Sequence, residues 1–457
     1  MRVEPRLAAA MRREFADWRV WLARALVIAF AGAAGLTVVG FTWITEHALE
    51  RFAAIQAFGW WIPLIWTPLC TGGIVWLTRR YFAGAAGSGI PQVMAALDPA
   101  VDAGQRGLYV SIRLAVAKVA LTTWGLLAGL SLGREGPSVQ VAAGVMHGAR
   151  RWLPRGAAVN EHGLLVAGGA AGIAAAFNTP LAGVMFAIEE LSRRPEQRSS
   201  GLIISGIVLA GLVAVSVYGN ATYFGVIRVP EINMALMWPG LLTALASGLA
   251  GGLFARLVLI SMGGHSGDRF TRWRRARPIT FAVGCGLGVA VIGVVTHGAT
   301  FGSGYFYARG MLEGNQDTSA VFVLLKFVAT WLTTWSGVPA GIFAPSLTIG
   351  AALGNDVATV TGYPHAATLI ALGMAGFLAA ATQAPLTAFI IVMEMVDGHA
   401  MVLSLMACSL IASGISRVLS RPLYPSLARM QLERLPPVPA AAPTPAPAPA
   451  TATDRAP

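Results

Sequence analysis

The chain has few charged residues and few cysteines for its length. Charged residues make up 12% of the 457 residues, whereas soluble domains average about 25%. Hydrophobic residues make up 55%, and the mean hydropathy is +0.64. This composition excludes an ordinary soluble domain and predicts a polytopic membrane protein. The three cysteines, Cys70, Cys285 and Cys408, are far apart and lack metal-ligand spacing, so we expect them only to pack among apolar neighbours.

Several sequence patterns that carry enzyme chemistry are also absent. The seven histidines show no HExxH or other metal-ligand spacing, which argues against a membrane metalloprotease. There is no Walker A or Rossmann pattern, so an ATP-driven pump is not supported. No Ser/Lys pair or pair of acids stands out as a catalytic group of a membrane enzyme. We therefore expect a protein that is not an enzyme and that uses no cofactor and no metal.

The positive charge is arranged as in membrane proteins rather than as in nucleic-acid-binding proteins. The net charge is +12, but the arginines cluster in short segments between apolar runs. Such segments are typical of cytoplasmic loops, so we expect both termini on the cytoplasmic side and no nucleic-acid partner. The arginine-rich segment Met1–Arg24 could belong to a signal peptide, but a cytoplasmic start before a first membrane helix fits its length better. The clusters include Arg79–Arg80, Arg150–Arg155, Arg193–Arg198, Arg269–Arg277 and Arg417–Arg434.

Many apolar runs are too short or too interrupted for a straight membrane helix, which needs about 20 residues. The chain contains 53 glycines and 26 prolines, which favour close helix packing and broken helices. Short and broken segments in corresponding positions of two halves are typical of transporters. The runs lie at about 25–42, 58–77, 108–131, 139–149, 163–189, 201–218, 235–260, 279–298, 320–335, 341–353, 366–393 and 400–419.

Three pairs of similar segments occur in the same order in the two halves of the chain. Ala174–Glu190 resembles Ala379–Met395, Gly133–Ser138 resembles Gly341–Ser346, and Gly87–Pro91 resembles Gly302–Phe306. The nearly constant spacing favours a duplication, and the alternative is chance similarity among glycine- and alanine-rich helices. We predict an N-terminal segment (1–20), two membrane repeats (21–230 and 231–430), often inverted in transporters, and a disordered Pro/Ala-rich tail (431–457).

The segment Gly133–Pro137 (GREGP) places Arg134 and Glu135 inside the apolar run Leu121–Val145. Charges at membrane depth are costly and indicate function. The two glycines allow a ligand to approach the backbone, and proline suits the first turn of a helix. Free N–H groups and the helix dipole make such a turn an anion site. We therefore interpret Glu135 as a built-in anion that competes with a small anion for one place.

Two more segments have a similar form. In Gly87–Pro91 (GSGIP), the hydroxyl of Ser88 lies between two glycines and can donate to an anion. In Gly341–Pro345 (GIFAP), the backbone N–H groups of Ile342 and Phe343 are available at the start of an apolar helix. Taken singly, Gly87–Pro91 is better explained as an ordinary turn between helices, and Gly341–Pro345 also has the alternative of a plain turn.

Taken together, these segments resemble the CLC family of chloride channels and chloride/proton exchangers. GSGIP, GREGP and GIFAP match the family pattern in every letter, and Arg417–Leu427 resembles its terminal segment. The resemblance covers residues 20 to 430 and implies an all-α homodimer, whose subunits each hold a pathway within two inverted repeats of tilted, broken helices. It also implies that Ser88, Tyr424 and the backbone N–H groups of Ile342 and Phe343 bind a central anion, and that Glu135 is the external gate.

Three ionisable residues outside these segments have competing interpretations. Glu189 and Glu190 could form a solvated helix end beside arginines, but by resemblance Glu190 matches the internal proton-transfer glutamate of the exchangers. Glu189 aligns with Glu394 across the two repeats, so we interpret it as structural. Lys118, in an apolar run, could raise the positive potential around an anion path or extend to the membrane surface.

We therefore predict a proton-coupled chloride antiporter, with chloride as its bound ion and protons as the exchanged ion. The alternative within the family is a passive, voltage- or pH-gated chloride channel, which Glu190 disfavours, because channel members commonly lack an acid there. An exchanger of another anion is a further alternative, which Ser88 disfavours by resemblance. The compact architecture is similar to bacterial members, so we expect a multi-pass protein of the bacterial inner membrane.

Overall fold

The computed structural model describes residues 18–154, 159–192, 200–219, 222–225, 234–263, 269–315 and 320–433. These residues form helices, with a single isolated β-bridge and no strand among them, so the prediction of an all-α protein is confirmed. Six helices are long and apolar enough to cross a membrane. The tail and the loop around Arg193–Arg198 lie outside the described residues, as does most of the N-terminal segment.

The helices follow the predicted apolar runs closely, but not at every end. The first long helix begins at Trp18 and extends to Ala57, well beyond the predicted run. In the first half the helices are α2 (Trp18–Ala57), α3 (Ile62–Tyr81), α4 (Ile90–Ala96), α5 (Ile112–Leu127), α6 (Glu135–Gly148), α7 (Glu161–Phe177), α8 (Pro180–Phe186) and α9 (Ser200–Tyr218). In the second half they are α10 (Met237–Gly263), α11 (Arg269–Ala276), α12 (Pro278–Val295), α13 (Tyr305–Leu312), α14 (Ala320–Ser336), α15 (Phe343–Thr361), α16 (Ala366–Thr382), α17 (Pro385–Met395), α18 (Val402–Leu419) and α19 (Leu423–Leu432).

The two longest predicted runs are each broken into two helices at the same point. Helix α7 ends at Asn178, with a φ of 59°, and α16 ends at Gln383, with a φ of 62°. A residue in the left-handed region terminates a helix, and a proline two residues later can start the next one. These prolines, Pro180 and Pro385, begin α8 and α17.

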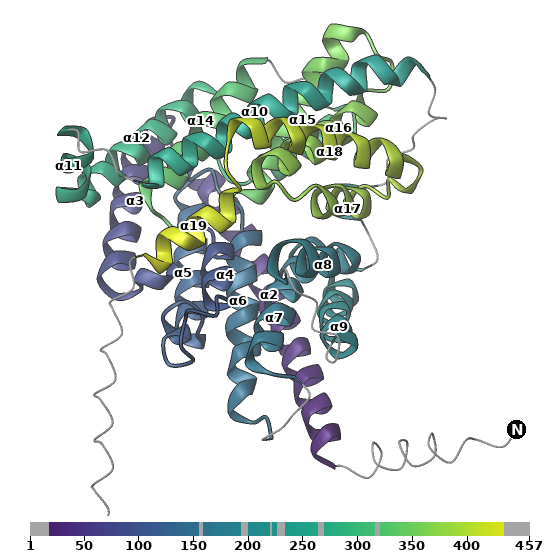
Figure 1. Ribbon diagram of the computed structural model, residues 1–457. Helices are drawn as coiled ribbons and strands as arrows, with labels where there is room; N and C mark the ends of the chain where they lie inside the picture. Colours follow the sequence, from purple (N-terminus) through teal and green to yellow (C-terminus); the bar gives the residue numbers. More distant parts are fainter. Residues whose placement is uncertain are drawn as a thin grey trace, which may run out of the picture.

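The two halves repeat the same packing. Helix α6 packs on α7 as α15 packs on α16, and α9 packs on α2 and α7 as α18 packs on α10 and α16. In Figure 1 the helices of the second half gather above those of the first, with α19 between them. The fold is therefore built from two repeats, and the predicted boundary near residue 230 falls outside the described residues.

The corresponding motif glycines of the two repeats pair with each other in the centre of the molecule. Gly133 N donates to Gly341 O at 2.8 Å, and Gly341 N donates to Gly133 O at 3.0 Å, in an antiparallel bridge. Two residues related by a local two-fold axis exchange hydrogen bonds in this reciprocal way. This pairing agrees with an inverted arrangement of the repeats.

A second reciprocal contact ties the repeats together through Glu189 and Glu394. Each carboxylate accepts two backbone N–H groups at the start of a helix of the other repeat, where such groups have no partner within the helix. The four bonds are Leu386 N and Thr387 N to Glu189 (3.1 and 2.7 Å), and Leu181 N and Ala182 N to Glu394 (3.1 and 2.7 Å). The structural interpretation of Glu189 agrees with this contact.

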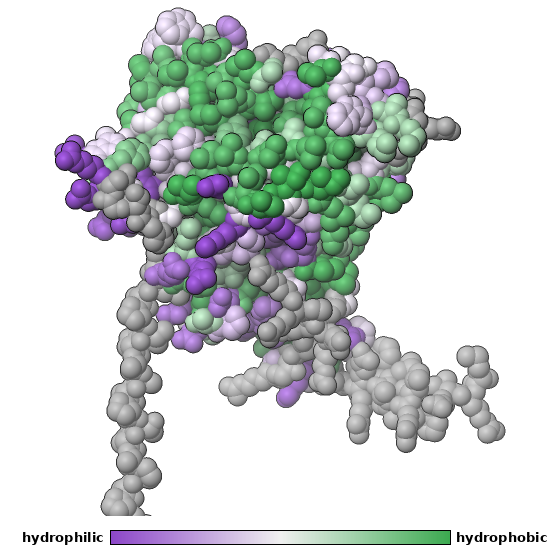
Figure 2. Space-filling view, turned by 45° about the horizontal axis from the view of Figure 1, so that its top comes forward, coloured by the Kyte–Doolittle hydropathy of each residue, from purple (hydrophilic) through white to green (hydrophobic). Residues whose placement is uncertain are grey.

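A broad apolar surface covers the helices of the second half in Figure 2. Hydrophilic residues gather at its left edge, where α11 lies, and below the apolar band. Helix α11 carries exposed Arg269, Arg272 and Arg275. A wide apolar band bordered by basic residues is the surface expected of an integral membrane protein.

Candidate functional site

The carboxylate of Glu135 lies at the meeting point of two helix N-termini. Glu135 begins α6 and is only 1% exposed. Its carboxylate lies beside the backbone N–H groups of Arg134 and Ala344, and so between the starts of α6 and α15. Its Oε2 atom fills the space that any side chain at Gly133 would need. The carboxylate therefore takes the position that helix dipoles favour for an anion.

Ser88 is held against the same turn by close backbone contacts. Gly89 has a φ of 108°, and a Cβ atom there would lie 2.6 Å from Gly136 O. A side chain at Gly136 would collide with Ser88 Oγ. The glycines of GSGIP and GREGP thus let two turns touch and bring the serine hydroxyl to the start of α6.

Tyr424 reaches the site from the other end of the chain. It lies in the first turn of α19, is fully buried, and stacks on Phe343 with ring centroids 6.0 Å apart. Ile342 and Phe343 form the start of α15 and are also buried. The structure therefore brings all four predicted anion-binding residues together.

Three oxygen atoms of this cluster are buried and have no hydrogen-bond partner among the described residues. They are Ser88 Oγ, Tyr424 Oη and Glu135 Oε2. A buried polar atom that no protein group satisfies is costly, so it indicates a functional role. Two hydroxyl donors beside the N-termini of α6 and α15 have the chemistry to bind a small anion.

Two cavities reach the cluster, and residues of the cluster line both of them. The basic mouth, about 570 Å³, is lined by Ser88, Ile342 and Tyr424 and by three arginines, namely Arg79, Arg274 and Arg275. The acidic mouth, about 270 Å³, is lined by Glu46, Glu50, Arg134 and Glu135. The cluster therefore lies between two openings, with Glu135 on the acidic side.

Glu190 lies outside this cluster but within electrostatic range of it. It follows α8 in the π-helical turn Ala187–Leu191 and is 8% exposed. Both Glu135 and Glu190 interact electrostatically with Tyr424, which places the tyrosine near both carboxylates. Single π-helical turns are frequent at functional sites, and this one directs adjacent acids differently, since Glu189 binds α17.

The structure gives Lys118 a role that neither sequence interpretation foresaw. Lys118 is fully buried, so an extension to the membrane surface is wrong. Its Nζ donates to Ala85 O and Gly87 O, both at 2.7 Å, and so holds the loop that carries Ser88. Lys326 does the same in the second repeat, donating to Thr300 O at 2.9 Å and Gly302 O at 2.8 Å.

The role of Lys326 was not predicted from the sequence, although the sequence contains a pattern that indicates it. These two residues are the only lysines among the 457 residues, and their spacing equals that between Gly133 and Gly341. A second lysine at the repeat spacing predicts an equivalent role. Each of the two amines binds two backbone carbonyl groups in a buried space.

Comparison with known proteins identifies the family. A profile of the voltage-gated chloride channel family matches residues 70–417. The chain belongs to this family. It is 31% identical to the H(+)/Cl(-) exchange transporter ClcA of Cronobacter sakazakii over 94% of this chain and 95% of that protein. It is 30% identical to the protein of the same name from Klebsiella pneumoniae, with 94% of each chain covered.

Solved structures of family members share the fold. The structure of a slow cyanobacterial Cl-/H+ antiporter matches 90% of this chain and 98% of its own, with a TM-score of 0.76 and 24% identity. A CLC-type fluoride/proton antiporter matches 93% of this chain and 99% of its own, with a TM-score of 0.71 and 21% identity. The fold of tilted, broken helices predicted from the family resemblance is thereby confirmed.

Proposed function

We propose that this family member is an antiporter that moves chloride across the membrane in exchange for protons. The observation that carries the proposal is the position of the Glu135 carboxylate, which lies at two helix N-termini between the basic and acidic mouths. The names of the curated relatives, H(+)/Cl(-) exchange transporters, support chloride and protons as the exchanged ions.

The anion is bound by hydrogen-bond donors rather than by a full positive charge. Ser88 and Tyr424 supply hydroxyl groups, and Ile342 and Phe343 supply backbone N–H groups at the start of α15. Each hydrogen bond to a charged partner contributes about 1.5–3 kcal/mol net of the hydration that it replaces. Binding through neutral donors also leaves the ion able to leave again in either direction.

Glu135 couples the anion to the proton because its ionised form competes for the same donors. A chloride ion that enters the cluster displaces the carboxylate, and protonation removes the charge that holds it at the helix N-termini. The protonated side chain then moves toward the acidic mouth, and the anion site opens. One protonation of Glu135 thus accompanies each opening of the anion site.

The proton leaves the anion path through a second carboxyl group, Glu190. Glu135 borders only the acidic mouth, so a proton that crosses the protein needs an acceptor on the other side of the anion cluster. Glu190 is buried and interacts electrostatically with Tyr424, which supports this role. The route between the two carboxyl groups needs transient water, which carries protons through apolar surroundings.

The arginines around the basic mouth support an orientation with that mouth toward the cytoplasm. The acidic mouth then faces outward, and Glu135 is the external gate. Family membership further supports a homodimer in the bacterial inner membrane, with one complete pathway in each subunit.

The test is a measurement on purified protein in liposomes. An imposed chloride gradient should drive proton movement against the proton gradient, with both fluxes recorded together. Chloride flux without proton movement would instead assign the protein to the passive channels of the family. A protein that moves neither ion, while remaining folded, would contradict both assignments.

A further inference from the structure

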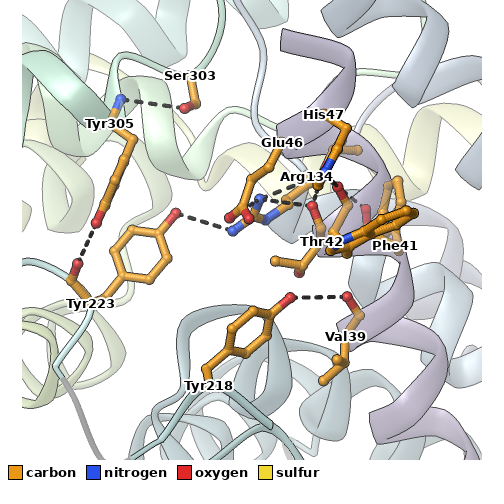
Figure 3. A network of polar contacts seen from close by, with 12 residues as sticks. Val39, Phe41, Thr42, Glu46, His47, Arg134, Tyr218, Tyr223, Ser303 and Tyr305 are labelled. Carbon is orange, nitrogen blue, oxygen red and sulfur yellow. Dashed lines mark hydrogen bonds and ion pairs between the residues drawn. The ribbon is translucent and has the colours of Figure 1, made fainter. Parts of the chain in front are cut away.

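The guanidinium group of Arg134, next to the proposed gate, is held by an acid from α2. Arg134 Nη1 donates to Glu46 Oε1 at 3.0 Å, and to Thr42 O and Thr45 Oγ1, both at 3.4 Å. The arginine side chain is 8% exposed, whereas that of Glu46 is 49% exposed. Figure 3 shows the guanidinium directed at α2, with Glu46 above it and Thr42 beside it.

The hydroxyl group of Tyr223 contacts the other side of the guanidinium. Arg134 Nη2 donates to Tyr223 Oη at 3.5 Å, and Tyr305 Oη donates to Tyr223 O at 2.8 Å. The rings of Tyr223 and Tyr305 lie edge to face, with centroids 4.7 Å apart. The guanidinium is thereby held between α2 and Tyr223, and Tyr223 in turn packs against Tyr305 of α13, as Figure 3 shows.

This arrangement decides how much positive charge the acidic mouth offers to Glu135. Arg134 and Glu135 are neighbours in the chain and interact electrostatically. An arginine without a counter-ion would stabilise the ionised form of Glu135 and attract anions into the mouth. Because Glu46 lies 3.0 Å from the guanidinium, part of that charge is compensated locally. The ionised carboxylate therefore gains less from moving into the mouth than it would beside an unpaired arginine.

We propose that Glu46 is a positioning residue which, through its ion pair with Arg134, sets the external pH at which Glu135 leaves the anion site. The inference rests on the proposed function, since it assumes that Glu135 is a proton-operated gate. Glu46 lines the acidic mouth but is not one of the groups assigned to bind the anion or carry the proton, and it acts through the charge and position of Arg134.

Other titratable groups face the same mouth and must be separated from Glu46 by experiment. The nearest carboxylate is Glu50, one turn further along α2, which also lines the mouth but makes no ion pair among the described residues. Substitution of Glu50 by glutamine removes the same charge from the mouth, so Glu50→Gln is the matched control. The remaining titratable groups around the network are Tyr218, Tyr223, Tyr305, His47 and Arg309.

The experiment compares Glu46→Gln, Glu46→Asp and Glu50→Gln with the wild type in liposomes, with chloride and proton fluxes recorded against external pH. Glutamine keeps a hydrogen-bond acceptor for Arg134 but leaves its charge uncompensated. The account predicts that Glu46→Gln shifts the midpoint of the external-pH dependence to lower pH by about 1 unit. Glu50→Gln should shift the midpoint much less, and Glu46→Asp should restore most of the wild-type value.

Fluxes at the most acidic pH show whether each variant is folded, because Glu135 is protonated there in all of them. Equal midpoints for Glu46→Gln and wild type, or equal shifts for Glu46→Gln and Glu50→Gln, would overturn the role of Glu46. A wild type that moves no protons would instead contradict the proposed function. The two failures are therefore distinguishable in one series of recordings.

Discussion

At the scale of single residues, two hydroxyl groups and one carboxylate form the proposed site. Ser88 Oγ and Tyr424 Oη are buried donors without a partner among the described residues, and Glu135 lies at the adjoining helix N-termini. Binding of an anion would satisfy both donors. An apolar replacement of either hydroxyl would remove one charged hydrogen bond without creating a large cavity.

The first prediction concerns chloride affinity. Ser88→Ala combined with Tyr424→Phe should weaken chloride binding by about tenfold or more for each lost hydrogen bond. Phenylalanine keeps the stacking on Phe343, so the fold of this region should survive. Calorimetric titration of chloride measures the effect, and Ser409→Ala, at a buried hydroxyl in α18, is the control. Unchanged affinity in the double variant would refute the assignment of the two donors.

The second prediction concerns the two lysines. Lys118→Met and Lys326→Met should each lower the melting temperature in detergent by several degrees, because two buried carbonyl groups lose their donor, at about 1–3 kcal/mol for each group. Only Lys118→Met should also weaken chloride binding, since its loop carries Ser88. Arg309→Met, which removes a half-exposed ion pair with Glu313, should change the melting temperature little. Melting at the wild-type temperature in both lysine variants would exclude a role in stability.

At the scale of helices, a glutamate of each repeat caps the N-terminus of a helix in the other repeat. We predict that Glu189→Gln and Glu394→Gln lower thermal stability by similar amounts, because each removes a charged acceptor from two backbone N–H groups. Proton coupling should persist in both variants. Loss of proton uptake in a fully stable Glu189→Gln would show that Glu189, rather than Glu190, belongs to the proton route.

The sequence predicted the helices well where hydropathy alone decides them, and less well where backbone geometry decides. The continuous run at 366–393 forms two helices, because Gln383 adopts a left-handed backbone conformation. Glutamine rarely adopts this conformation, so the residue type does not predict the break. The motif residues of the site were found because glycine, proline and charge are rare together in apolar runs. Glu46 was not found from the sequence. The face of α2 that meets Arg134 depends on how α2 packs, and hydropathy does not predict that packing.

At the scale of the whole molecule, the charges of the two mouths predict the orientation in the membrane. The described cysteines are all buried, so a cysteine introduced at an exposed position can be labelled selectively. We predict that a membrane-impermeant thiol reagent labels Phe306→Cys, in the acidic mouth, on intact bacterial cells. Arg79→Cys, in the basic mouth, should react only after the cells are opened. The reverse pattern would place Glu135 on the cytoplasmic side.

The central claim is that Glu135 and Glu190 together couple protons to chloride. Its most direct test is the paired recording of chloride efflux and proton uptake by wild type, Glu135→Gln and Glu190→Gln in liposomes. The account predicts that wild type moves protons against their gradient, and that both variants keep substantial chloride flux while proton transport disappears. Unchanged proton pumping by either variant would contradict its assigned role, and a wild type that moves chloride alone would contradict the exchange itself.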